Sequence, residues 1–406
     1  MAYSYFYSDT IFNSFVDVGI TKLFRQIVLK HLMAIILSCF IPGYAGKTVQ
    51  FGNNSQNHRT TVAYFLNKGK WDDSELDIIL KKDILDQIMK VHEETKQPIC
   101  LIIDDSISGK TDPSSQARHP IDDAYYHFSH LLGKQQYGHQ WVTLMIACGD
   151  LCLPYDMVLY DKSKTKIEIA QDFANNFPEL GDIAELYSLF DSWYTCEKVV
   201  GAFSQKGFHT IAAIKTNRKI KLHGQSVSIK ELAENLSSCN PHFHFGPVTV
   251  NGRRYYVARV EGSLKGIDNV AVLLSYPAKA FGNPKCLRAF MCTDTRLTTL
   301  EILERYCLRW PIEIFFRTTK GKLGFADYEL RSRKGMNRLM LVTRLAYIIG
   351  CKISPTKKFC DGYKIIAENI QKERVNYIYN LARAGYSLEY VYKEMKTPIV
   401  NMGDVD

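Results

Sequence analysis

Four polar residues in the last third of the chain have side chains suited to metal and phosphate chemistry. On a helix of about 100° per residue they would share a stripe of about 60°: Tyr306, Arg309, Glu313 and Lys320. The opposite face would be apolar, with Leu308, Ile312 and Phe315. A carboxylate can hold a divalent ion, and the other three groups donate hydrogen bonds to phosphate oxygens. The stripe therefore suits phosphodiester chemistry, although such spacings also suit a solvated face with intrahelical ion pairs.

Two short apolar runs each end in aspartate. Residues 98–103 lead into Asp104 and Asp105, and residues 186–190 lead into Asp191. Such runs are typical of buried strands, and open α/β sheets place their chemistry at the carboxyl ends of strands. A helix N-cap is the second interpretation of Asp191. Because successive strand residues point to opposite faces, we expect only one of Asp104 and Asp105 at a shared site.

These motifs together resemble one family. The spacing Tyr306-x2-Arg309-x3-Glu313-x6-Lys320 resembles the signature of a subgroup of the DDE transposases of bacterial insertion sequences. Residues 103–106 are similar to the first-aspartate strand of that family, and residues 190–194 to the second. Two dipeptides and one weaker match also look like the family: Thr293-Asp294, Arg309-Trp310 and residues 58–66. The resemblance covers residues 45–345.

The resemblance implies a ribonuclease-H-like α/β fold, a mixed sheet flanked by helices, with a β-rich insertion and helical N- and C-terminal regions. Family members usually carry Asp-x-Thr/Ser at the first strand, which selects Asp104, two positions before Ser106, with Asp105 as the alternative. Asp104, Asp191 and Glu313 would be the catalytic residues. They would hold two Mg²⁺ or Mn²⁺ ions per site, since both ions prefer hard oxygen ligands.

The implied substrate is DNA. The protein would bind transposon ends, cleave them and join them to target DNA, acting as a homodimer in the DNA complex. Seven residues would bind DNA phosphates: Tyr306, Arg309, Lys320, Arg317, Lys215, Arg218 and Lys219. The last three follow a predicted strand and suit a solvated run equally well. A DNA-binding protein of the same descent with lapsed catalysis and a nuclease without strand transfer stay open as alternatives.

Composition agrees with a DNA-binding protein of the cytoplasm. The net charge of +9 suits a polyanionic partner. The 11 cysteines include no CxxC pair, which favours reduced thiols in a bacterial cytosol over a disulfide framework. The apolar stretch 32–41 is too short for a membrane span of about 20 residues, so we expect a buried helix there and no membrane association.

The 406 residues predict two or three domains. Residues 1–95 are expected to form a helical DNA-binding region of the helix-turn-helix kind, or a bundle that only packs on the core. The catalytic core would comprise residues 96–218 and 289–345, separated by a β-rich insertion at 219–288. Residues 346–406 would form a C-terminal helical region.

The predicted order of elements within the core is more detailed. After the first strand we expect a polar loop over 106–137, a hairpin of 140–148 and 151–160, and then helix, strand, helix and strand up to residue 214. The helix that carries Glu313 should begin at the capping box Thr298-x-x-Glu301. Pro311 lies inside it and predicts a kink just before Glu313.

Overall fold

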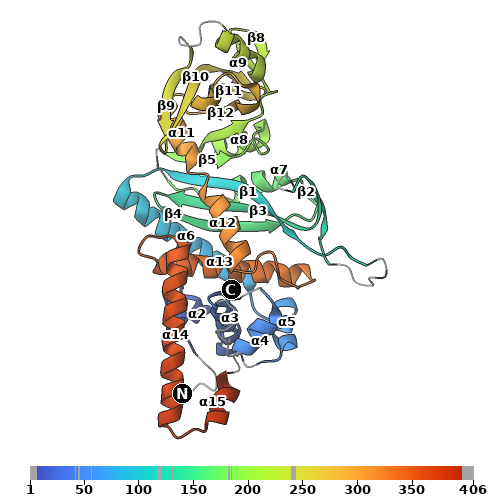
Figure 1. Cartoon of the computed structure of the whole chain (residues 1–406), viewed down its shortest axis with the longest axis vertical. Helices are drawn as coiled ribbons and strands as arrows, with labels where there is room; N and C mark the ends of the chain where they lie inside the picture. Colours follow the sequence, from blue (N-terminus) through green and yellow to red (C-terminus); the bar gives the residue numbers. More distant parts are fainter. Residues whose placement is uncertain are drawn as a thin grey trace. The chain divides into compact units, whose positions relative to one another are not determined.

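The computed structural model divides the chain into two compact units (Figure 1). Unit 1 comprises Met1–Met89, Ser106–Trp141 and Phe315–Asp406, and unit 2 comprises Lys90–Asp105 and Val142–Ile314. The structure describes residues 7–395 except 42, 44, 45, 56, 115, 117–120, 130, 131, 182, 184 and 239–243. The ends of the predicted N- and C-terminal regions, residues 1–6 and 396–406, therefore lie outside the described residues.

Unit 1 is mainly helical. Its helices are α1 (Asp9–Val18), α2 (Ile20–Leu23), α3 (Gln26–Cys39), α4 (Thr48–Ser55), α5 (Arg59–Asn67), α6 (Asp73–Thr95, which ends in unit 2), α13 (Arg333–Ile353), α14 (Phe359–Arg383) and α15 (Leu388–Met395). The apolar stretch of α3 is buried from Leu32 to Cys39, as predicted. Helix α13 packs against α3, α5 and α14. No helix in the described part of the chain is long and apolar enough to cross a membrane.

A buried arginine joins two helical segments of unit 1. Arg338 of α13 is 1% exposed, and its Nη2 lies 2.7 Å from Asp73 Oδ1. Its guanidinium also donates to the carbonyl oxygens of Gly69 (2.9 Å) and Trp71 (2.7 Å). A charge can be buried only when it is paired and hydrogen-bonded, and Arg338 meets both conditions.

The strands form one mixed sheet with the order β2-β3-β1-β5-β6-β12-β11-β10-β7-β8, in which β4 also pairs with β3 and β9 with β10. The bounds are β1 (Ile99–Gly109), β2 (Tyr125–Ser129), β3 (Lys134–Cys148), β4 (Leu151–Leu159), β5 (Leu186–Phe190), β6 (His209–Ile214), β7 (Lys219–Leu222), β8 (Gln225–Ser228), β9 (Gly246–Val250), β10 (Arg253–Leu264), β11 (Ile267–Pro277) and β12 (Arg288–Cys292). The remaining helices are α7 (Lys166–Asn176), α8 (Glu197–Gln205), α9 (Ile229–Ser238), η1 (Ala278–Ala280), η2 (Pro284–Cys286), α11 (Thr299–Cys307) and α12 (Pro311–Lys322).

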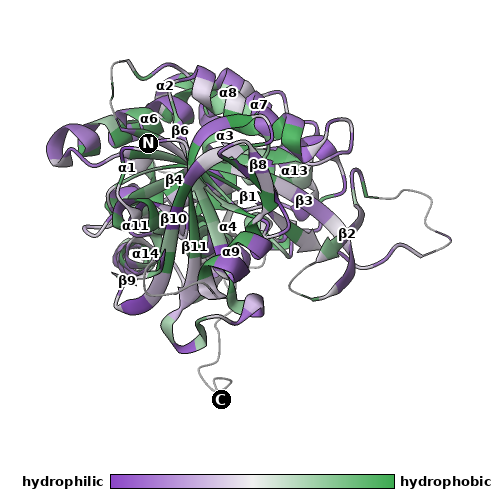
Figure 2. Cartoon of the chain, turned by 90° about the horizontal axis from the view of Figure 1, so that it is seen from above, coloured by the Kyte–Doolittle hydropathy of each residue, from purple (hydrophilic) through white to green (hydrophobic). Residues whose placement is uncertain are grey.

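Parallel strands make the centre of this sheet in unit 2. β1 pairs in parallel with β5, and β5 with β6. All five residues of β5 are buried, as are the first five of β1. Parallel strands covered on both faces are expected to be apolar throughout, and Figure 2 shows hydrophobic residues gathered along the strands. The result is a mixed α/β fold with a large sheet flanked by helices, consistent with the predicted ribonuclease-H-like architecture.

The β-rich segment continues the same sheet through antiparallel pairs. β12 pairs with β6, β11 with β12, and β10 with β11. The turn between β9 and β10 is Asn251-Gly252, and both residues have positive φ (48° and 73°). This is the backbone conformation that a two-residue hairpin requires, and β9 and β10 pair antiparallel on either side of it.

The polar segment 106–137 differs from the loop predicted for it. β1 continues to Gly109, and the segment also contains β2 and the first residues of β3. The backbone N–H of Lys110 donates to the carbonyl of Tyr137 at 2.8 Å. Polar side chains do not end a strand whose backbone still has a pairing partner, because the ladder is made by main-chain groups.

Candidate active site

The register of two parallel strands in unit 2 brings Asp104 and Asp191 side by side. β1 pairs with β5 so that Ile103 lies opposite Phe190, and an aspartate follows each of them. Neighbouring strands lie about 4.8 Å apart. Asp104 and Asp191 each come directly after one of two paired residues, so they are close neighbours. Two aspartates from separate motifs, 87 positions apart (191 − 104), therefore lie beside each other in the interior of the sheet.

Asp104 is largely buried and lies close to two other carboxylates, which disfavours its charged form. Its side chain is 18% exposed. Burial raises the pKa of its carboxyl to about 7; the Arg309 guanidinium opposes this shift, and the charges of Asp191 and Asp105 add to it. Arg309 Nη1 donates to Asp104 Oδ2 at 2.7 Å. A carboxylate in these surroundings needs a neighbouring cation to stay ionised at neutral pH.

Asp191 caps a turn rather than a helix. Its Oδ1 accepts hydrogen bonds from the backbone N–H groups of Trp193 (2.8 Å) and Tyr194 (3.4 Å). Helix α8 begins only at Glu197, with Cys196 at the N-cap. The second interpretation of Asp191, as the N-cap of that helix, is therefore wrong. The turn instead fixes the aspartate at the end of β5.

Glu313 and Tyr306 lie on two different helices, which corrects the single kinked helix predicted from the sequence. Helix α11 begins with the predicted capping box and ends at Cys307, and α12 begins at Pro311. Proline has no N–H to donate and fits the first position of a helix. The chain therefore ends one helix and starts another. The predicted polar stripe from Tyr306 to Lys320 does not lie on a single continuous helix.

Arg309 lies in the turn between these helices and joins the carboxylates. While its Nη1 contacts Asp104, its Nη2 donates to Glu313 Oε1 at 2.9 Å. Glu313 is the more exposed partner, at 39% against 15% for the arginine side chain. The Tyr306 ring packs on Phe290, with centroids 4.7 Å apart. Burial raises the Tyr306 pKa, so its hydroxyl keeps the proton and can donate a hydrogen bond.

Asp105 has different partners from Asp104. Its Oδ1 accepts hydrogen bonds from Lys166 Nζ (2.9 Å) and Tyr194 Oη (2.7 Å). The Lys166 ammonium also lies 4.1 Å from the Trp193 ring centroid. Sequence analysis missed Lys166: the capping box at the start of α7 locates that helix, but no local pattern indicates that its first residue reaches β1.

The other predicted phosphate-binding residues are distributed over both units. Lys215 and Lys219 are exposed, while Arg218 is half-buried and donates from Nη1 to the Thr195 carbonyl at 2.8 Å. Arg317 is exposed on α12. Lys320 lies on the same helix but belongs to unit 1, where burial lowers its pKa.

The donor set suits a hard divalent ion, and Arg309 contacts two of its carboxylates. Asp104 and Asp191 are neighbours by register, and Asp104 and Glu313 present oxygens to one shared cation. Within the described residues, no three His, Cys, Asp or Glu side chains form a group that could hold a metal ion. The guanidinium of Arg309 lies between two of the carboxylates, so these side chains would have to shift to hold an ion together.

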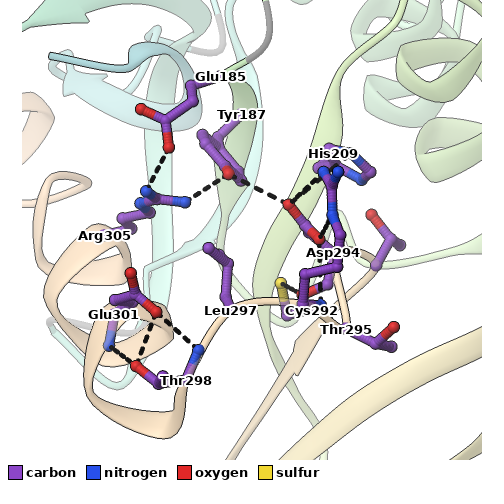
Figure 3. Close-up of polar contacts among 12 residues, drawn as sticks. Glu185, Tyr187, His209, Cys292, Asp294, Thr295, Leu297, Thr298, Glu301 and Arg305 are labelled. Atoms are coloured by element: carbon purple, nitrogen blue, oxygen red, sulfur yellow. Dashed lines mark hydrogen bonds and ion pairs between the residues drawn. The ribbon is translucent and has the colours of Figure 1, made fainter. Parts of the chain in front are cut away.

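A second polar cluster lies at the opposite ends of the parallel strands (Figure 3). Tyr187 Oη donates to Asp294 Oδ2 at 3.3 Å and accepts a hydrogen bond from Arg305. Arg305 Nη2 also contacts Glu185 Oε1 at 2.6 Å. Hydrogen bonds from Arg296 hold the pKa of Asp294 at about 2, against the opposing effect of burial. Because Arg305 lies on α11, this cluster ties α11 to the start of β5.

Comparison with known proteins places the chain in a family. A search of curated proteins gave no match. The model of the transposase DDE domain matches residues 95–349, which is more than half of the chain and includes both aspartate strands and the helix that carries Glu313. The chain therefore belongs to the transposase DDE domain family.

Proposed function

We propose that this protein binds the ends of an insertion sequence, cleaves them and joins them to target DNA. Asp104, Asp191 and Glu313 would be the catalytic residues and would hold two Mg²⁺ or Mn²⁺ ions. The observation that carries this proposal is the strand register in which Asp104 and Asp191 each follow one of two paired residues. The two ion pairs of Arg309, which link Asp104 to Glu313, add to it. The contacts of Asp105 with Lys166 and Tyr194 support Asp104 as the ligand.

The chain's own residues would prepare the reaction in distinct ways. When bound, two divalent ions activate the attacking oxygen and stabilise the departing one. A guanidinium has five N–H donors, and two of those of Arg309 contact carboxylates, so others can face a DNA phosphate. Tyr306 would donate its retained proton to a phosphate oxygen. Lys320 and Arg317 would add positive charge on the helix that carries Glu313.

Several wider features belong to the same proposal. The helical region 1–95 would recognise the DNA ends, residues 96–218 and 289–345 would form the catalytic core, and 219–288 the insertion. The protein would act as a homodimer in the DNA complex, in the bacterial cytoplasm. Inverted repeats bracketing the gene would supply the end sequences for direct assays.

The decisive experiment compares end binding with cleavage in wild type and Glu313→Gln. This substitution keeps the size of the side chain and removes the charge that would hold a metal ion. We expect Mg²⁺-dependent cleavage to disappear while end binding survives. Glu304→Gln, at an exposed position of α11, is the matched control and should cleave normally.

The same assay separates the alternatives. Wild-type protein that binds ends but never cleaves them with Mg²⁺ or Mn²⁺ would indicate lapsed catalysis. Cleavage without joined products would indicate a nuclease without strand transfer. Equal loss of binding and cleavage in a folded Glu313→Gln variant would make Glu313 structural and contradict the proposal.

A further inference from the structure

A basic pocket in unit 2 is lined in part by Thr195 and Cys196, which follow the turn after β5. Its volume is about 810 Å³, which falls within the range of ligand sites, about 300–1,000 Å³. Three segments form its walls: the start of α8, the β7–β8 hairpin with the residue before it, and the turn between β10 and β11. The described residues that line it include no aromatic side chain, so it offers no surface for stacking a base.

Positive charge dominates the lining. Five cationic residues line the pocket: Lys198, Arg218, Lys219, Lys221 and Lys265. Two acidic residues, Glu197 and Asp268, oppose them, which leaves a net charge of +3 (5 − 2). None of the four lysines forms an ion pair with another described residue, and all four are exposed. Their charges are therefore available to an anion.

The local structure explains why the lysines of β7 gather on one side. Lys219 and Lys221 are two positions apart on a strand, so both point to the same face. Ile220 between them is fully buried on the other face. Lys221 pairs with Ser263 of β10 and with Ser226 of β8, and both serines line the pocket. The lysine pair is thus held on a paired strand rather than on a loose loop.

Hydrogen bonds connect the pocket to the candidate active site. Arg218, in the pocket wall, donates from Nη1 to the carbonyl of Thr195 at 2.8 Å. Thr195 in turn donates from Oγ1 to the carbonyl of Asp191 at 2.9 Å. Thr195, which follows the turn after β5, therefore contacts both Arg218 of the pocket and the backbone of Asp191.

We propose that this pocket binds backbone phosphates of the DNA strand that reaches Asp104 and Asp191. The inference rests on the proposed function, and it assigns part of the DNA path to residues outside the carboxylate site. Phosphate is the ligand that exposed lysines and a half-buried arginine suit best. The start of α8 also lines the pocket, and its N-cap residue Cys196 makes no side-chain capping bond, so the partial positive charge of this helix N-terminus adds to that of the lysines.

The test removes the two lysines of β7 and follows the salt dependence of DNA-end binding. In the Lys219→Ala/Lys221→Ala variant, the slope of log K against log salt should flatten by about 1.8 if both lysines contact duplex phosphates, or by about 1.4 if they contact a single strand. Lys279→Ala/Lys285→Ala is the control, because it removes the same charge from exposed positions of unit 2 that do not line the pocket. The control should keep the wild-type slope.

The outcomes separate this inference from the proposed function. An unchanged slope in the β7 variant, with Mg²⁺-dependent cleavage intact in the wild type, would overturn the pocket proposal alone. An equal flattening in the control pair would also overturn it, since the effect would then belong to net charge. A wild-type protein that binds no DNA end would overturn both proposals.

Discussion

Arg309 Nη1 lies 2.7 Å from Asp104 Oδ2, which joins the turn between α11 and α12 to the middle of β1. The two residues are 205 positions apart in the sequence. The second arm of the same guanidinium contacts Glu313, so one planar group sets the spacing between two candidate metal ligands. An ammonium is a point charge and cannot hold two carboxylates at a fixed separation.

The first prediction concerns the simultaneous contacts of Arg309 with Asp104 and Glu313. Arg309→Lys keeps the charge but should lose one of the two contacts, since a lysine has no second arm. A hydrogen bond to a charged group contributes about 1.5–3 kcal/mol, so single-turnover cleavage should fall about ten- to hundredfold. Cleavage rates at saturating DNA measure the effect. A lysine variant with the wild-type rate would show that positive charge alone is enough.

The second prediction distinguishes Asp104 from Asp105. Asp104→Asn should abolish Mn²⁺ binding measured by calorimetry, because it removes a proposed ligand. Asp105→Asn should keep Mn²⁺ affinity but weaken the contacts with Lys166 and Tyr194. Its free energy of unfolding should fall by about 1–3 kcal/mol. Equal loss of Mn²⁺ affinity in both variants would contradict the assignment of separate roles.

The strands near the aspartates could be predicted because each one is indicated by residues adjacent in the sequence. Residues 186–190 and 209–214 are apolar runs bounded by polar turns, and the structure gives strands with those bounds. The hairpin turn at Asn251-Gly252 also follows from local chemistry, since few other residues adopt positive φ in succession. The family signature added the order in which these strands meet.

The parts that could not be predicted depend on contacts distant in sequence. The periodicity from Tyr306 to Lys320 is continuous, and only the position of Pro311 at the start of α12 shows that the chain forms two helices. The contacts of Arg309 with two carboxylates and of Lys166 with Asp105 depend on how strands and helices pack. The spacing of residues in the sequence does not reveal this packing. β1 extends past its apolar residues for the same reason, because backbone pairing sets its length.

The third prediction concerns acid stability and the cluster around Asp294. Its pKa is about 2 in the folded protein and about 3.9 in an unfolded chain. A lowered carboxyl pKa stabilises the fold at pH values above the unfolded pKa, and this contribution is lost as the pH falls from about 4 to 2. Asp294→Asn should therefore lower the melting temperature at pH 6, and its difference from wild type should shrink towards pH 2. A difference that stays constant with pH would show that the charge of Asp294 does not stabilise the fold.

The last prediction concerns Lys320, whose ammonium makes no hydrogen bond or ion pair with any described residue although its side chain is half-buried. One explanation is that Lys320 holds a DNA phosphate; the other is that only its aliphatic stem matters, through packing. Lys320→Met keeps an unbranched apolar stem and removes the charge, so it separates the two. If the lysine contacts one duplex phosphate, the slope of log K against log salt should flatten by about 0.9 in both Lys320→Met and Lys320→Ala. If only packing matters, Lys320→Met should bind and cleave DNA ends like wild type, and the loss should be confined to Lys320→Ala. End binding across a salt series decides between them, and a wild-type slope in Lys320→Met would remove this lysine from the phosphate-binding set.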